Sequence, residues 1–386
     1  MDLNRRLISR LALLGAFAPL GPCLAAPAQA GMVPQLRDAV AQIMRAHGIP
    51  GMAIAVSRQG RHAFHNFGVA SKATNTPVSS DTLFEIGSVS KTFTATLAAL
   101  GQSTGRLSLA DSPASFLPEL DGSPIAQVDL LGLATHTAGG FPLQVPDGVD
   151  TPEQLTAYLR AWKPAYAPGS ARSYANPSIG LLGMAAARAW GMPFTEALEK
   201  MLFPALGLRD TYIDVPEAAM GRYAQGYDKA DAPVRVNPGM LAAEAYGVKT
   251  SARELIRFID LNIDPAQAEK PLAQALESTR TGYFQLGAMT QGLVWEQYDA
   301  PPALEALLEG NSNRVAYETH AVKRLAPPRP AQAHAWVNKT GSTNGFGAYA
   351  AFLPAERAGV VILANRNFPV EARVRLALLV LKNQKS

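Results

Sequence analysis

The sequence predicts an α+β fold: an antiparallel sheet built from both chain ends and flanked by helices, with a helical region inserted between them. Short apolar or alternating runs, which are typical of strands, occur at residues 51–69 and again at residues 335–364. Residues 91–208 are instead rich in Ala and Leu and are interrupted by Pro and Gly, as expected for short helices joined by loops. Similar elements at the two ends, around a different centre, indicate one sheet with an insertion.

Periodicity assigns most of the individual elements at the two ends. Apolar residues recur at helical spacing over residues 33–47, and Gly48-Ile49-Pro50 ends this amphipathic helix. Residues 51–56 and 62–69 predict a β-hairpin. The elements expected near the C-terminus are strands at residues 335–339, 348–353 and 359–364 and a last helix at about residues 371–382.

The length of the chain, 386 residues, exceeds that of a typical single core, so two regions are expected. The first is an α/β region that holds the sheet, at residues 31–86 and about 247–386. The second is a mostly helical region at about residues 87–246. Its last part, about residues 213–246, has little periodicity and many turn-forming residues. Long loops of this kind in compact domains are usually functional.

The first thirty residues have the layout of a secretory signal peptide. Three arginines precede an apolar run at residues 11–20, and Ala28-Gln29-Ala30 offers small residues for cleavage. The run is well below the roughly 20 apolar residues that a membrane-spanning helix needs. We therefore expect cleavage near Ala30, export to a bacterial periplasm and no membrane attachment of the mature protein. Cys23 leaves a lipoprotein as an alternative.

Charge and cysteine content exclude several classes of protein. The formal net charge is +4, of which Arg5, Arg6, Arg10 and Asp2 of the signal account for +2, which leaves about +2. No run of Lys or Arg is interleaved with aromatic residues, so a nucleic-acid partner is not expected. Cys23 is the only cysteine, so a chain cleaved near Ala30 has neither a disulfide nor a thiolate. A monomer is expected, although the sequence leaves the oligomeric state open.

The histidines give no sign of a metal centre. His62 and His65 are three residues apart in a predicted strand and therefore point to opposite faces. The other four histidines are scattered without a partner at ligand spacing. We expect neither a metal nor another cofactor. No G-x-S-x-G elbow is present, although a Ser-His-Asp triad assembled in space stays open.

Three short motifs occur once each and in a fixed order: Ser88-Val89-Ser90-Lys91, Tyr174-Ala175-Asn176 and Lys339-Thr340-Gly341. Chance gives roughly one S-x-x-K or Y-x-N in a chain of this length, but a K-T-G in only about one chain in twenty. The three motifs together are therefore a much stronger signal than any one of them.

The first motif suits a serine nucleophile. It opens a helical pattern, so Ser88 and Lys91 are expected one turn apart on the same face. A serine hydroxyl needs a base to take its proton, and a lysine can serve when its pKa is lowered. The alternative is an ordinary helix cap at Ser88 with a solvated Lys91.

The other two motifs suit the walls of a binding cleft. Tyr174 and Asn176 are expected in a loop, where side chains can reach a cleft, although a buried tyrosine bonded to backbone is the alternative. Lys339-Thr340-Gly341 ends a strand, and Gly341 allows a ligand to approach the backbone closely. The alternative there is an edge strand protected by a lysine.

Together these motifs resemble the active-site set of the penicillin-recognising serine enzymes, the superfamily of serine β-lactamases and D-alanyl-D-alanine peptidases. The tyrosine of the second motif is similar to that of class C (AmpC-type) β-lactamases. Residues 137–144, 243–249 and 339–349 resemble the same class. The resemblance covers essentially the whole chain after the signal and implies a β-lactamase/transpeptidase-like fold.

The resemblance also implies roles for particular residues. Ser88 would be the nucleophile, Lys91 and Tyr174 would share the proton transfers, and the backbone N–H groups of Ser88 and Ser342 would form an oxyanion hole. The loop that ends at Tyr246 corresponds to the Ω-loop. The residues implied to contact or support the substrate are Gln144, Asn176 and Tyr246 around its side chain and Lys339, Thr340, Ser342, Asn367 and Arg373 around its carboxylate. Val370 departs from the asparagine that many class C enzymes carry there.

The implied function is hydrolysis of β-lactam antibiotics, of the cephalosporinase type, through an acyl-enzyme on Ser88. The partner would be a small β-lactam molecule, and the activity would confer β-lactam resistance. Three alternatives stay open: a D-alanyl-D-alanine peptidase, a β-lactamase-like esterase, and a penicillin-binding receptor that is acylated without turnover.

Overall fold

The computed structural model describes residues 34–383. The expected signal peptide and its cleavage position near Ala30 lie outside the described residues.

A ten-stranded antiparallel sheet forms the larger part of the fold, with the order β14-β10-β11-β12-β15-β16-β17-β1-β2-β3. The two chain ends meet inside this sheet, because β1 pairs with β17 from Met52 opposite Ala364 to Arg58 opposite Ala358. The strands are β1 (Gly51–Arg58), β2 (Arg61–Ser71), β3 (Thr76–Pro77), β10 (Gly282–Leu286), β11 (Met289–Gln291), β12 (Glu296–Asp299), β14 (Lys323–Arg329), β15 (Ala335–Ser342), β16 (Gly347–Leu353) and β17 (Ala358–Ala364).

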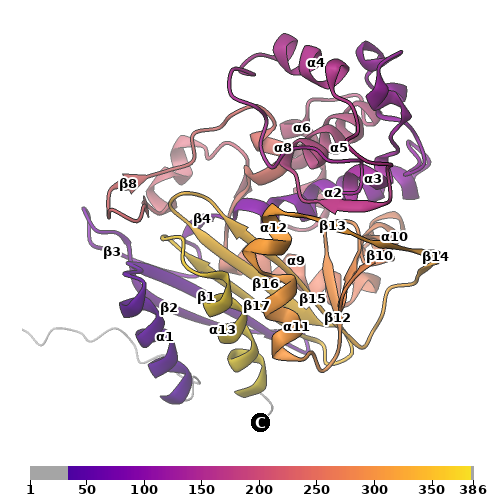
Figure 1. The fold of residues 1–386 in the computed structure, drawn as a ribbon. Coiled ribbons are helices and arrows are strands. Elements are labelled where there is room, and N and C mark those ends of the chain that lie inside the picture. Colours follow the sequence, from indigo (N-terminus) through magenta and orange to yellow (C-terminus); the bar gives the residue numbers. More distant parts are fainter. Residues whose placement is uncertain (1–33, 384–386) are drawn as a thin grey trace, which may run out of the picture. The chain divides into compact units, whose positions relative to one another are not determined.

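Helices cover both faces of the central strands. In Figure 1, α1 (Pro34–Ala46) and α13 (Val370–Asn383) lie in front of the sheet, and α9 (Ala252–Ile263) lies behind it. Every residue of β16 and β17 is buried, as expected for strands covered on both faces.

The centre of the inserted part is α2 (Lys91–Ser103), in which every residue from Lys91 to Gly101 is buried. A helix that is buried all round belongs to a core, and α2 packs against α5 (Asn176–Ala189) and α10 (Lys270–Thr279). The remaining α-helices of four residues or more are α3 (Leu130–Ala134), α4 (Pro152–Ala161), α8 (Ala242–Tyr246), α11 (Leu304–Gly310) and α12 (Asn313–Tyr317). Short strands outside the main sheet are β4 (Leu83–Glu85), β5 (Ala171–Ser173), β6 (Thr211–Tyr212), β7 (Gly226–Tyr227), β8 (Pro233–Val234), β9 (Lys249–Ser251) and β13 (Thr319–Ala321).

The expected α+β fold is confirmed. The N-terminal helix, the hairpin, the three C-terminal strands and the last helix all form within a few residues of their expected bounds. The strands β10, β11, β12 and β14 were not expected, because they are short and their polar residues hide the alternation. The residue boundaries of the two expected regions stay a prediction.

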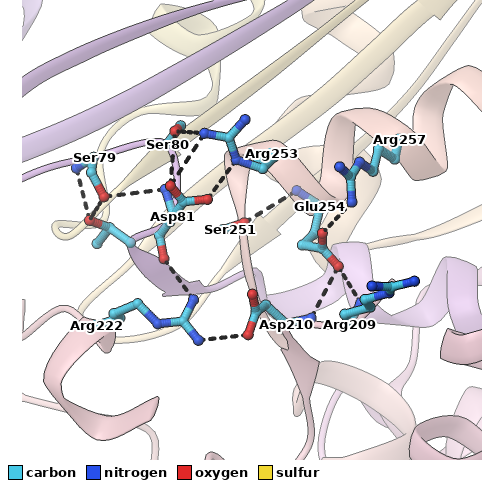
Figure 2. A network of polar contacts seen from close by, with 11 residues as sticks. Ser79, Ser80, Asp81, Arg209, Asp210, Arg222, Ser251, Arg253, Glu254 and Arg257 are labelled. Atoms are coloured by element: carbon cyan, nitrogen blue, oxygen red, sulfur yellow. Dashed lines mark hydrogen bonds and ion pairs between the residues drawn. The ribbon is translucent and has the colours of Figure 1, made fainter. Parts of the chain in front are cut away.

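A network of polar side chains ties three distant segments together, at residues 79–81, 209–222 and 251–257 (Figure 2). Arg253 pairs with Asp81 at 2.6 Å, and Arg222 pairs with Asp210 at 2.6 Å. Glu254 is 3% exposed, and its Oε2 accepts the backbone N–H of Arg209 at 2.6 Å and of Asp210 at 3.1 Å. Glu254 therefore fixes the start of β6 to the start of α9.

Replacing Glu254 by leucine should destabilise the protein. The change leaves the backbone N–H groups of Arg209 and Asp210 without an acceptor, so we expect the free energy of unfolding in urea to fall by about 2 kcal/mol. Arg257→Ala is the control, because it removes the half-exposed partner of Glu254 and should cost less than about 1 kcal/mol. Equal losses in the two variants would show that the backbone acceptor role is wrong.

Candidate active site

A cavity of about 560 Å³ brings most of the predicted site residues together. Ten of the twelve line it, and they include residues of all three motifs: Ser88, Gln144, Tyr174, Asn176, Tyr246, Lys339, Thr340, Gly341, Ser342 and Asn367. The other two, Lys91 and Arg373, are buried behind the cavity wall. Val370, the position that departs from the class C pattern, also lines the cavity.

Ser88 and Lys91 lie at the junction of a 3₁₀ turn, η1 (Gly87–Ser90), with α2. Lys91 is fully buried, and its Nζ donates to Ser88 Oγ at 2.8 Å and to the carbonyl oxygen of Ala245 at 2.9 Å. The Ser88 side chain caps no backbone N–H. The alternative of a capping serine beside a solvated lysine is therefore wrong.

Burial also changes the acidity of Lys91. Desolvation is the main cause, and the nearby positive charge of Lys339 adds to it, so that the pKa of Lys91 falls to about 8. An amine with this pKa exists partly in its neutral form near physiological pH, in which it can accept the proton of a serine hydroxyl.

Two glycines allow β15 to lie directly against the Ser88 turn. A Cβ on Gly341 would lie 1.9 Å from the carbonyl oxygen of Ile86. A Cβ on Gly87, whose φ is +49°, would lie 2.5 Å from the backbone nitrogen of Ser342. Only glycine permits these approaches, which bring the backbone of Ser342 beside Ser88.

Tyr174 lies between three cationic side chains, in the short connection from β5 to α5. The centroid of its ring is 5.1 Å from Lys91 Nζ, 5.1 Å from Lys339 Nζ and 5.4 Å from Arg172 Cζ. Its hydroxyl oxygen is buried close to Ser88 and Lys91, without a hydrogen bond of standard geometry in the described chain. Desolvation raises the pKa of Tyr174, but the positive charges of Lys339 and Lys91 outweigh it and lower the pKa to about 8.

A buried ion pair that the sequence analysis missed lies beneath Tyr174. Arg172 is 1% exposed, and its Nη2 lies 3.2 Å from Oε1 of Glu296, which is 5% exposed. Lys339 Nζ lies 3.9 Å from the same oxygen, and Asn338 donates to Oε2 of Glu296 at 3.3 Å. Glu296 thus partly balances the positive charge of the site. Its strand, β12, was not expected, and no motif contains it.

His136 is another residue near the site to which the sequence analysis assigned no role. Its ring centroid lies 4.4 Å from that of Tyr174, and its Nδ1 accepts the backbone N–H of Ala175 at 3.3 Å. Burial, with the charges of Arg172, Lys91 and Lys339, holds the pKa of His136 well below its ordinary value. A neutral imidazole therefore supports one face of the tyrosine ring.

Another part of the cavity lining carries amide side chains. Asn176 donates to Oε1 of Gln144 at 2.8 Å, and Asn176 Oδ1 is buried without a partner in the described structure. Both Tyr174 and Asn176 were expected in a loop. Tyr174 does lie in a loop, but Asn176 is the first residue of α5. Tyr246, at the end of α8, lines the cavity as well.

Arg373 supports the end of β15 from behind. Its Nη1 donates to the carbonyl oxygen of Gly341 at 2.6 Å and to Ser342 Oγ at 3.1 Å. Its Nη2 donates to Oδ1 of Asn367 at 2.5 Å. Arg373 is thus a support for the cavity wall, whereas Asn367 reaches the cavity itself.

No group of three His, Cys, Asp or Glu side chains within residues 34–383 is arranged to hold a metal ion. In the same part of the chain, no helix is long and apolar enough to cross a membrane.

Known proteins share both the sequence and the fold. A β-lactamase family profile matches residues 36–384. A β-lactamase from Lysobacter lactamgenus is 49% identical to this chain over 366 residues, which cover 95% of each protein. A crystal structure of a β-lactamase/D-alanine carboxypeptidase from Pseudomonas syringae is similar, with a TM-score of 0.89 and 53% identity over 91% of this chain and 98% of that one. A class C β-lactamase in complex with cefoxitin has a TM-score of 0.86 and 44% identity over 90% and 99% of the two chains.

The fold and the identities agree with one another over nearly the whole described chain. This chain therefore belongs to the β-lactamase family and is a serine β-lactamase of class C.

Proposed function

We propose that this protein hydrolyses β-lactam antibiotics through a covalent acyl-enzyme on Ser88. The hydrogen bond of 2.8 Å from Lys91 Nζ to Ser88 Oγ supports this proposal most directly, since it places a base of lowered pKa on the nucleophile. The relative that was crystallised with cefoxitin, which is a β-lactam, supports the substrate class. Such an activity would confer β-lactam resistance.

In the first half of the reaction, Ser88 Oγ attacks the carbonyl carbon of the lactam ring. The hydroxyl proton passes to the pair formed by Lys91 and Tyr174. The oxyanion would accept hydrogen bonds from the backbone N–H groups of Ser88 and Ser342. The close packing at Gly87 and Gly341 brings these two backbone segments together. The C–N bond of the ring then breaks, the ring nitrogen takes up the proton, and an ester on Ser88 is left.

In the second half, a water molecule attacks the ester carbonyl. Tyr174 is the best base for this step, because its pKa is about 8 and its side chain lies beside both Ser88 and Lys91. The water proton returns to Ser88 Oγ as the ester bond breaks, and the opened acid leaves. Lys91 and Tyr174 interact closely, so their protons belong to the pair and not to either residue alone.

Substrate binding would depend on the positive charge and the neutral amide groups that line the cavity. Lys339 and Thr340 on β15, with Asn367 beside them and Arg373 behind, would hold the carboxylate of a β-lactam. Gln144 and Asn176 would bind the amide of the acyl side chain, and Tyr246 would cover it. The unpaired Oδ1 of Asn176 is an acceptor that such an amide N–H would satisfy.

A second candidate is a D-alanine carboxypeptidase. The relative from Pseudomonas syringae is described as both a β-lactamase and a D-alanine carboxypeptidase, and it shares 53% of its residues with this chain. Both reactions would use the same acylation of Ser88. Turnover of a peptide ending in D-alanyl-D-alanine, measured beside that of a cephalosporin, separates them.

We also propose that the mature protein begins near Gly31 and acts in the periplasm as a monomer. The signal-like pattern of the first thirty residues supports export. The N-terminal sequence of protein recovered from the periplasm of an expressing strain would test the cleavage position, and light scattering would test the monomer.

Ser88→Ala should abolish hydrolysis. With catalytic amounts of mature enzyme, we expect cephalosporin turnover, measured by ultraviolet absorbance, to fall by more than about a thousandfold because no other nucleophile replaces the hydroxyl. The matched control is Ser178→Ala, which removes a buried hydroxyl on α5 that donates to the carbonyl oxygen of Leu133, outside the cavity. Full turnover by Ser88→Ala would overturn the proposal of an acyl-enzyme on Ser88. If the wild-type protein instead formed one equivalent of a stable adduct without turnover, it would be a penicillin-binding receptor. Ester turnover without ring opening would indicate an esterase.

The rate should also rise with pH across the pKa values of the pair. Both Lys91 and Tyr174 have a pKa of about 8, and the deprotonated pair is the base, so kcat/KM should increase as pH rises toward about 8 and level off above it. Lys339→Met should move the rising limb of this pH–rate profile to higher pH, because the charge of Lys339 lowers the pKa of both groups. Lys200→Met, at a largely exposed lysine, should leave the limb in place. A limb that does not move in Lys339→Met would contradict the electrostatic account.

A further inference from the structure

Glu85 is a buried carboxylate beside the active site that the reaction scheme does not use. It is the last residue of β4, three positions before Ser88, and it is 1% exposed. It does not line the cavity. Because a carboxylate is costly to bury, its hydrogen bonds decide what it does for the protein.

Three donors from two other segments converge on this carboxylate. Its Oε1 accepts the hydroxyl of Tyr223 at 2.7 Å and the backbone N–H of Val236 at 2.8 Å. Its Oε2 accepts the hydroxyl of Thr343 at 2.6 Å. An ionised carboxylate only accepts hydrogen bonds, so both hydroxyls must point their hydrogens toward Glu85.

The two segments form different walls of the cavity. Tyr223 and Val236 belong to the stretch before α8, where Val236 and its neighbours line the cavity. Thr343 directly follows Ser342, at the end of β15. One carboxylate therefore joins the strand that leads to Ser88, the wall before α8 and the turn that carries the Ser342 N–H.

Further contacts hold the same arrangement around Tyr223. The guanidinium of Arg235 lies 4.0 Å from the centroid of the Tyr223 ring and donates to the Tyr223 carbonyl oxygen at 2.8 Å. The ring of Phe346, just after the turn of Thr343, stacks on that of Tyr223 at 6.4 Å and meets the ring of Phe84 edge-on at 6.3 Å. Apolar packing thus brings the three segments together, and the hydrogen bonds to Glu85 fix their positions relative to one another.

We propose that Glu85 is a positioning residue for the hydrolysis, which it serves by holding the Ser342 N–H at the distance from Ser88 that the oxyanion requires. This inference rests on the proposed function, because the oxyanion role of Ser342 is part of that proposal. Through Tyr223 and Val236, the same carboxylate also sets the width of the cavity.

Glu85 has two arms, the hydrogen bond to Thr343 and the hydrogen bonds to Tyr223 and Val236, and their loss should have separable kinetic effects. Thr343→Val removes the arm to β15 and should lower kcat about tenfold with KM little changed, a fraction of the roughly hundredfold loss expected for a missing oxyanion donor. Tyr223→Phe removes one bond to the other wall and should change KM more than kcat. Thr211→Val is the matched control, because it breaks a buried hydroxyl pair with Thr250 away from the cavity.

Changes at Glu85 itself test whether the carboxylate acts through geometry. Glu85→Gln should keep kcat within about threefold of wild type, because its amide oxygen still accepts from Tyr223 and Val236 while the Thr343 hydroxyl can reverse and accept. Glu85→Ala should lower kcat roughly a hundredfold. If Glu85→Ala fails to fold, the two single-arm variants still decide the proposal. Wild-type kcat in Thr343→Val, or the same loss in Thr211→Val, would overturn it.

Amide hydrogen exchange separates this inference from the proposed function. Glu85→Ala or Thr343→Val should speed exchange at residues 343–346, and Ser88→Ala should not. Suppose that Ser88→Ala kept full activity while these amides responded as expected. The reaction scheme would then be wrong, but Glu85 would still be shown to hold the turn at residues 343–346 in place. Unchanged exchange in both Glu85→Ala and Thr343→Val would show that Glu85 does not hold this turn in place.

Discussion

The positive charge buried around Tyr174 is the constraint on which the site depends. The Nζ atoms of Lys91 and Lys339 both lie 5.1 Å from the centroid of the tyrosine ring, and Arg172 Cζ lies 5.4 Å from it. Glu296 is the carboxylate that pairs with two of these cations. The excess of positive charge favours the phenolate of Tyr174 and the neutral amine of Lys91, and it would also attract the carboxylate of a β-lactam. In the proposed mechanism, one electrostatic arrangement thus serves both proton transfer and binding.

The fold makes this arrangement stable by burying its supports in rigid elements. Lys91 begins a helix that is buried on all sides, and Lys339 lies on a central strand of the sheet. Gly87 and Gly341 let that strand press against the Ser88 turn without a side chain between them. The sheet is completed by pairing β1 with β17, so the position of β15 depends on both ends of the chain.

The sequence predicted the residues that touch the cavity better than those beneath it. The three motifs are short and local, so Ser88, Tyr174 and Lys339 could be singled out from the sequence, and the resemblance to class C β-lactamases then implied their roles. Arg172, Glu296 and His136 act through contacts between segments far apart in the chain, and no local pattern marks them. The same reason explains the missed strands β10–β12, whose pairing is set by the sheet and not by their own alternation. The role of Glu85 likewise depends on which donors the fold brings to it.

The most direct test of this account is a pH titration of tyrosinate absorbance in the mature protein, with Tyr174→Phe as the reference. Burial raises the pKa of seven other tyrosines above the ordinary value, so these seven do not contribute to the absorbance change near pH 8. We predict that the difference between the two proteins shows one tyrosine ionising with a pKa of about 8. A difference that emerges only near the ordinary value of 10.0 would show that the buried cations do not set the acidity of Tyr174.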